Sequence, residues 1–310
     1  MKLPGEDVEL FYTLHRALLV FLNQRESVIP GVSTVEEFIA LPVESKNELR
    51  AAIYEHPETI DAFVDENPFR FSAEDLEIVR GWKHLVKGEF YLYQYLKKYA
   101  IFLDAGTPPK AYGVVALISD FQEMLGPEYP IYLKAVLLPF KGQIIYDGVL
   151  FPYPVFFGPG YRRDLKEMYQ EAKARFGIIT TIPHEAHVPE SDAELLKTYL
   201  SSDSLQFRHQ AEIDRLLKRN PHLLTLYHQE LGKRHARVIG RRLARLGLAN
   251  AWFALFHGEV IAGGSTRAEV VQIVARLLPA EQRDFAYLFH LKGSTGAKHA
   301  TGTTTSAGED

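Results

Sequence analysis

The sequence predicts an α+β fold in three parts: a helical N-terminal part (residues 1–88), a central antiparallel β-meander or open barrel (89–183), and a C-terminal part (190–292) of basic helices followed by a ββαβ unit. Apolar residues recur with helical spacing in the first part. Aromatic and β-prone residues separated by short turns dominate the second. Residues 293–310 are polar and small with no large apolar side chain, which predicts a disordered tail.

The N-terminal part carries helix signals. Leu10, Leu14, Ala17, Leu18 and Phe21 follow the spacing of one helix face. This run predicts the first long helix of the chain.

Capping residues place the next helices. Ser33 and Glu36 suit a capping box for a short helix, and Ser72 caps a later one with Asp75 three residues on. Another helix is expected over residues 44–54.

The central part predicts strands joined by short connections. Lys141 and Gly142 suit a two-residue hairpin turn. Gly158, Pro159 and Gly160 lead into a helix over residues 161–175. Strands are expected over residues 89–104, 111–118, 131–140, 143–150 and 178–182.

The C-terminal part begins after an expected linker at residues 183–189. Ser191 and Glu194 suit a capping box, and residues 205–246 are largely helical. Breaks are expected at Asn220–Pro221 and at the glycines 232 and 240. The ββαβ unit follows, with a His257–Gly258 turn, a helix capped by Thr266, and strands over residues 252–256, 259–262 and 285–291.

Composition excludes several classes of site. The 310 residues contain no cysteine, which rules out disulfides, a cysteine nucleophile, iron–sulfur clusters and thiolate zinc sites. The longest apolar stretch near the N-terminus, residues 17–22, is too short to span a bilayer and follows acidic residues. We therefore expect a cytoplasmic protein that does not bind a membrane, with no cofactor and no metal.

A basic segment stands out against the formal net charge of −4. Residues 206–246 contain ten Lys/Arg and three Asp/Glu, so this segment carries +7 and the remainder −11. Four arginines share one helix face, and two further basic residues flank them. Such a ridge suits the phosphates of a nucleic acid or a partner protein. The alternatives are a solvated face, or a face that docks on the acidic N-terminal part of the chain. The candidate residues are Lys233, Arg234, Arg237, Arg241, Arg242 and Arg245.

Residues 158–163 form a candidate anion site. Gly158 and Gly160 precede a helix whose first turn has free N–H groups, and Arg162 and Arg163 lie in that turn. Positive side chains there oppose the helix dipole, which a bound phosphate or carboxylate would explain. The alternative is a simple glycine turn with both arginines paired to acids.

Asp147 is a candidate general base or metal ligand, with Asp104, Asp120 and Glu128 as the available partners. The alternative is that Asp147 and the following glycine form a β-bulge.

His184 and His187 could share a metal. However, prolines bracket them, so a loop is favoured over the helix that a zinc motif requires. No Gly-x-Ser-x-Gly motif marks a serine nucleophile.

Two parts of the chain carry resemblances. Residues 138–150 (LPFKGQIIYDGVL) and 157–163 (FGPGYRR), with 65–68 and 82–102, resemble a family of uncharacterised bacterial proteins over roughly residues 41–183. Residues 252–264 (WFALFHGEVIAGG) are similar to a small bacterial domain of unknown function. These resemblances imply a bacterial, cytoplasmic protein and assign no catalytic residue.

Three hypotheses for function follow. The first is a non-catalytic module that binds a protein or a nucleic acid, because catalytic signatures are absent while a basic segment is present. The second is a phosphate-directed hydrolase or nuclease that uses Asp147 with Arg162 and Arg163. The third is a structural subunit of a larger assembly.

Overall fold

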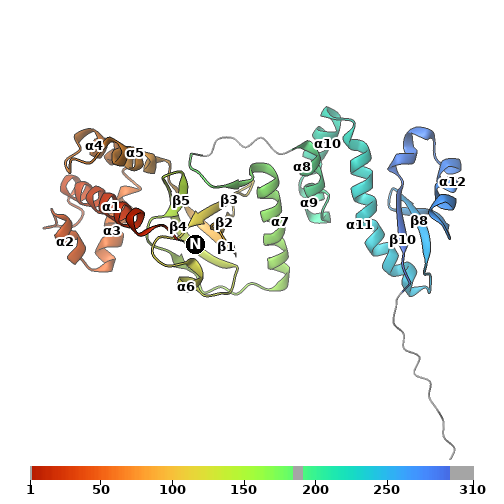
Figure 1. The fold of residues 1–310 in the computed structure, drawn as a ribbon, viewed down its shortest axis with the longest axis horizontal. Helices are drawn as coiled ribbons and strands as arrows, with labels where there is room; N and C mark the ends of the chain where they lie inside the picture. The colour runs from red at the N-terminus through yellow and green to blue at the C-terminus, as the bar shows by residue number, and fades with distance from the viewer. Residues whose placement is uncertain (1, 184–190, 294–310) are drawn as a thin grey trace, which may run out of the picture. The chain divides into compact units, whose positions relative to one another are not determined.

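The structure, a computed structural model, describes residues 2–183 and 191–293. The chain divides into two compact units between residues 190 and 191 (Figure 1). Among the described residues, no helix has the length and apolarity needed to cross a membrane.

The first unit begins with helices and the short turn of 3₁₀ helix that leads into the sheet. Thr34, one residue later than predicted, caps the second helix. Its side chain accepts from the N–H of Glu37, and the Glu37 carboxylate accepts from the N–H groups of Ser33 and Thr34. Ser72 caps the fifth helix as predicted. The elements are α1 (Gly5–Glu26), α2 (Val35–Ala40), α3 (Val43–Ile53), α4 (Glu58–Glu66), α5 (Ala73–Gly81) and η1 (Trp82–His84).

Five strands then close into a barrel, so of the two predicted arrangements the simple meander is wrong. The strands are β1 (Val86–Tyr95), β2 (Ala100–Asp104), β3 (Ala111–Val115), β4 (Ile131–Phe140) and β5 (Gln143–Tyr146). Their order is β1-β2-β3-β5-β4, and β4 pairs again with β1. The sheet is mixed, because the β4–β5 hairpin places β5 parallel to β3. Helix α6 (Phe121–Leu125) connects β3 to β4.

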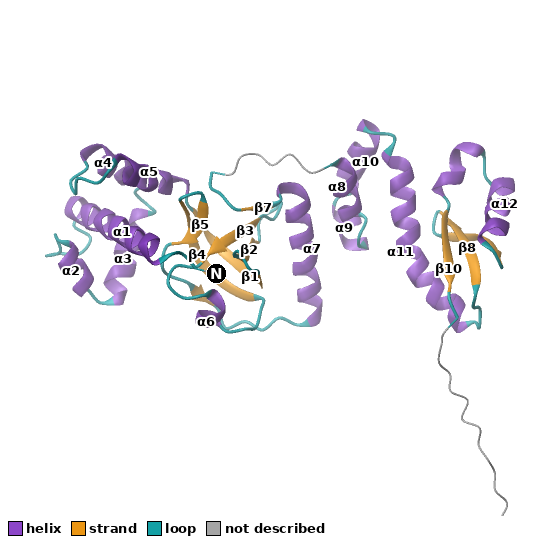
Figure 2. Ribbon diagram, in the orientation of Figure 1, coloured by secondary structure: helices purple, strands orange, loops and turns teal. Residues whose placement is uncertain are grey.

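Two layers of helix cover this barrel (Figure 2). Helices α1–α5 pack with the barrel in one continuous core, so residues 1–88 do not form a unit of their own. Helix α7 (Pro159–Phe176) covers the outer face of β1, β2 and β3 on the opposite side. The short strands β6 (Phe151–Pro152) and β7 (Ile178–Ile179) extend the sheet at β4 and β3.

The second unit combines a helical part with a three-stranded antiparallel sheet of order β10-β8-β9. Ser191 and Thr266 cap α8 and α12 as predicted. The elements are α8 (Asp192–Tyr199), α9 (Asp203–Arg208), α10 (Gln210–Arg219), α11 (Leu223–Arg245), β8 (Ala251–Phe256), β9 (Glu259–Gly264), α12 (Arg267–Leu277), η2 (Ala280–Phe285) and β10 (Tyr287–Leu291).

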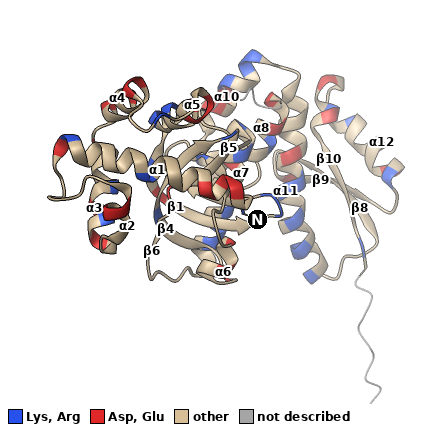
Figure 3. Ribbon diagram, turned by 60° about the vertical axis from the view of Figure 1, so that its left-hand side comes forward, with Lys and Arg blue, Asp and Glu red and all other residues tan. Residues whose placement is uncertain are grey.

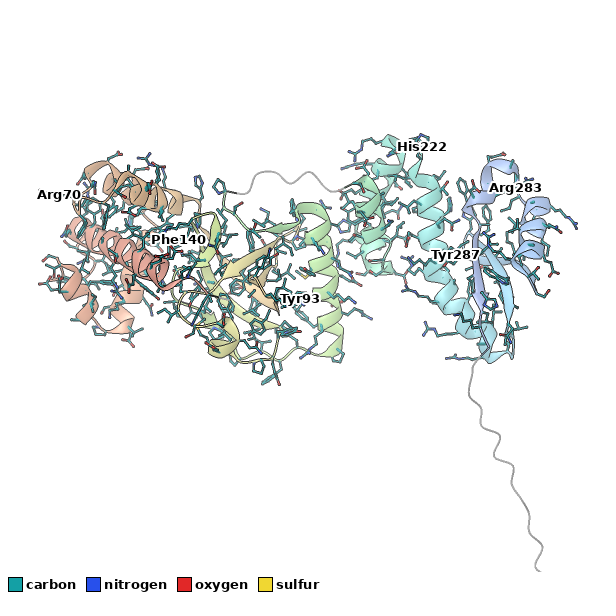
Figure 4. All side chains as sticks on the ribbon, viewed as in Figure 1. Arg70, Tyr93, Phe140, His222, Arg283 and Tyr287 are labelled. Carbon is teal, nitrogen blue, oxygen red and sulfur yellow. The ribbon has the colours of Figure 1, made fainter. Side chains whose placement is uncertain are left out.

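Helix α11 is continuous, so the breaks predicted at its two glycines are wrong. Gly232, Ala236 and Gly240 recur every fourth residue and are buried. A Cβ on Gly232 would lie 2.2 Å from the Cβ of Tyr287, which projects from β10 toward α11 (Figure 4). Close approach of β10 explains these glycines better than a helix break. The predicted break at residues 220–221 is present, because α10 ends at Arg219.

Candidate functional site

Asp147 lies directly after β5, buried among donors. Its carboxylate accepts from Arg50 Nε at 2.7 Å, from the Tyr54 hydroxyl, and from the Val149 N–H at 3.3 Å. Asp147 is 2 % exposed and Arg50 9 %. Arg50 also donates from Nη1 to Asn47 Oδ1 at 3.0 Å. The pair therefore anchors α3 to the end of β5.

Burial dominates the electrostatics of this cluster. It raises the pKa of Asp147, against the opposing effect of Arg50 and the hydrogen bond from Tyr54. It raises the pKa of Tyr54 well above 10, helped by the Asp147 charge. It also lowers the pKa of the neighbouring His15 to about 3, an effect that the charges of Arg50 and Arg16 reinforce. The histidine is therefore neutral at physiological pH.

The arrangement does not favour Asp147 as a general base. Its carboxylate oxygens already accept from three donors, and no second carboxylate among the described residues lines the pocket beside it. Asp104 accepts from the N–H groups of residues 106 and 110 within its own turn. Asp120 caps α6, and Glu128 is exposed.

The predicted anion site at the start of α7 has the predicted backbone but is packed by aromatic rings. Gly158 is the N-cap and Pro159 begins the helix. The rings of Phe157 and Tyr161 stack with centroids 5.0 Å apart, and the Tyr161 hydroxyl lies 2.5 Å from that of Tyr91. These contacts fix the start of α7 on β1.

Neither arginine of this turn contacts Asp147 in the described structure. Arg162 Nε donates to the Phe157 carbonyl at 3.3 Å. Arg163 is exposed and, within residues 2–183 and 191–293, pairs with no carboxylate. Neither lines the pocket beside Asp147, so the structure does not bring the proposed hydrolase residues together. Anion binding by Gly158, Gly160, Arg162 and Arg163 stays a prediction.

The six basic candidates of α11 divide into two groups. Arg234 is largely buried: it donates to the Leu200 carbonyl at 2.9 Å and pairs with Asp203 at 2.9 Å. It therefore joins α11 to α8 and α9 rather than facing a partner. Lys233 pairs with Glu230 at 3.5 Å.

The other four form an exposed group in the last turns of α11, which we call the arginine end. Its members are Arg237, Arg241, Arg242 and Arg245. None of them pairs with a carboxylate in the described part of the chain. Figure 3 shows basic residues without acidic ones along this end of the helix. Leu246, which is 78 % exposed, and Val238 add apolar surface beside it.

Sequence reasoning missed a histidine cluster in the second unit. His228 and His235 of α11 line a cavity of about 220 Å³ with His257, which lies in the β8–β9 turn. The rings of His228 and His257 lie 5.1 Å apart, and burial, with the charge of His257, lowers the pKa of His228. The seven-residue spacing on α11 was visible in the sequence, whereas only the fold brings His257 to it.

No metal site was found in the described residues. No group of three or more His, Asp or Glu side chains there has an arrangement that could hold a metal ion. The segment with His184 and His187 lies outside the described residues.

Comparison with known proteins gives no relative. The chain matches no protein-family model, no curated protein and no solved structure. The geometry of its own side chains is therefore the basis for any functional argument.

Proposed function

We propose that this chain is a bacterial, cytoplasmic, non-catalytic binding protein whose second unit contacts the phosphates of a nucleic acid through the arginine end of α11. One observation carries the proposal: four exposed arginines lie within three helical turns, and none of them pairs with a carboxylate among residues 2–183 and 191–293. No Asp or Glu occurs between Glu230 and Glu259, so no nearby acid along the chain neutralises them.

The chemistry of these side chains suits phosphate. Guanidinium groups form paired hydrogen bonds to phosphate oxygens and remain charged at every physiological pH. The acidic remainder of the chain opposes avid binding, so contact is expected to be local and strongly dependent on salt. Four phosphate contacts predict a slope of about −3 to −4 in log affinity against log salt on duplex DNA.

The experiment measures that slope with labelled duplex DNA and RNA. Replacing Arg237, Arg241, Arg242 and Arg245 by Gln should bring the slope close to zero. The melting temperature should change little, because all four side chains are exposed and make no ion pair in the described structure. The favourable interaction of Arg242 and Arg245 with the helix dipole is lost, but so is the repulsion among the four positive charges.

A matched control removes the same charge elsewhere in the second unit. Its substitutions to Gln are at Arg215, Lys218, Arg267 and Arg276, all exposed. This control should retain most of the salt slope. Equal loss in both variants would show that only overall charge matters, and absence of binding at low salt would leave a protein partner as the better hypothesis.

A further inference from the structure

The pocket beside Asp147 is a concave site of the first unit. Helices α1, α2 and α3 and the residues after β5 enclose a pocket of about 210 Å³. This is smaller than the roughly 300–1,000 Å³ of pockets for drug-sized ligands, so its ligand would be small.

Basic side chains outnumber acidic ones in the lining of this pocket. Arg16 of α1 and Lys46 and Arg50 of α3 line it, and Asp147 is the only carboxylate among the described residues that line it. His15 adds no charge, since burial and the two arginines keep its imidazole neutral. The lining therefore carries a net charge of about +2 from its side chains.

Two of these basic side chains form no ion pair with the described residues and keep N–H groups that a ligand could accept from. Arg16 stacks over the Tyr12 ring at 5.1 Å and pairs with no carboxylate among the described residues. Lys46 donates to the Ile39 carbonyl at 2.7 Å, which accounts for one of its three N–H groups. Arg50, by contrast, is held by Asp147 and Asn47.

Part of the remaining lining is apolar. These apolar residues are Leu19, Phe38, Ile39, Val43 and Val149. Ile39 is 47 % and Val43 66 % exposed, although both are large apolar side chains. Exposed apolar residues beside a concave charged wall are typical of a ligand site.

We infer that this pocket binds a small organic carboxylate with an apolar body. Arg16 and Lys46 hold the carboxylate, and the body lies against the apolar side chains of α2 and α3. A monoanion with an apolar body is favoured over phosphate, because moving a dianion out of water into a partly apolar pocket costs more free energy than moving a monoanion. The apolar walls also give a bare phosphate nothing to bury.

Calorimetry of the full chain with benzoate, hexanoate, benzamide and inorganic phosphate tests the inference. One of the two carboxylates should bind with a Kd of about 1 mM or tighter, and benzamide and phosphate at least tenfold more weakly. Arg16→Gln and Lys46→Gln should each weaken the carboxylate about tenfold. Arg80→Gln, which removes an exposed charge from α5, is the control and should change nothing.

Val43 provides a test that does not disturb the buried groups. Val43→Glu places a negative charge at the exposed mouth and should weaken carboxylate binding, whereas Val43→Gln should retain most of it. The inference is overturned if neither carboxylate binds at 20 mM, a concentration about twentyfold above the expected Kd. Equal binding of benzamide and benzoate, or equal weakening by Arg80→Gln and Arg16→Gln, would also overturn it.

Discussion

The two glycines of α11 should respond to the same substitution with opposite signs. Alanine in place of helical glycine stabilises a helix by about 1 kcal/mol. At Gly240 a Cβ would meet Phe289 and Leu291 at 3.6 and 3.7 Å, which is ordinary contact. Gly240→Ala should therefore raise the free energy of unfolding by about 1 kcal/mol.

At Gly232 the added Cβ would lie 2.2 Å from the Tyr287 Cβ and 2.8 Å from its Cγ. Normal carbon contacts are about 3.5–4.0 Å, so α11 and β10 must separate by about 1.5 Å. Overpacking of this kind costs about 1–3 kcal/mol. Since the gain in helix propensity is common to both variants, their stabilities should differ by about this amount.

Urea unfolding followed by tryptophan fluorescence measures the difference. The chain has two tryptophans, Trp82 in the first unit and Trp252 in β8 of the second. In a Trp82→Phe background the signal reports the second unit alone. If Gly232→Ala stabilises this unit as much as Gly240→Ala, the close packing of α11 on β10 is refuted.

Two further predictions concern the first unit. His15 has a pKa of about 3 in the folded protein, below the usual 6.5, so stability present above pH 6.5 is lost as pH falls toward 3. At pH 4 the free energy of unfolding should be about 3 kcal/mol lower than above pH 6.5, as measured by urea unfolding at a series of pH values. This decrease should be smaller in His15→Gln. It should not be smaller in His84→Gln, which replaces an exposed histidine. Asp147→Ala should lower the free energy of unfolding by about 3–5 kcal/mol, because it leaves the Arg50 charge buried without its partner. Asp61→Ala, which breaks an exposed pair with Lys83, should change it by less than about 1 kcal/mol, and similar losses in both variants would contradict the role of burial.

Local signals in the sequence predicted local structure well. Ser72, Ser191 and Thr266 cap helices, because a side-chain oxygen three residues before a free N–H is a short-range feature. The turn residues Lys141 and His257 take positive φ beside glycines in the hairpins that were predicted. The α+β class follows from these elements.

The sequence did not predict which strands and side chains that are distant along the chain come together. A short connection predicts a hairpin, but nothing in residues 111–115 indicates that they pair in parallel with β5. Arg50 was not singled out at all, because its role depends on meeting Asp147, 97 residues later. Arg234 shares the spacing of its exposed neighbours, and only the packing of α8 and α9 distinguishes it from them.

Closure of the barrel has a consequence for the order of folding. Residues 90–92 of β1 pair with β2 on one side and with β4 on the other, so the ring is incomplete until strands distant in sequence meet. The sheet of the second unit starts from a two-residue hairpin, and its helix α12 packs on strands next to it in the chain. Folding rates fall as contacts become less local. The second unit, which follows the first in the chain, is therefore expected to reach its native sheet sooner once it is free of the ribosome. The search for barrel closure sets the time in which apolar strands of the first unit are exposed.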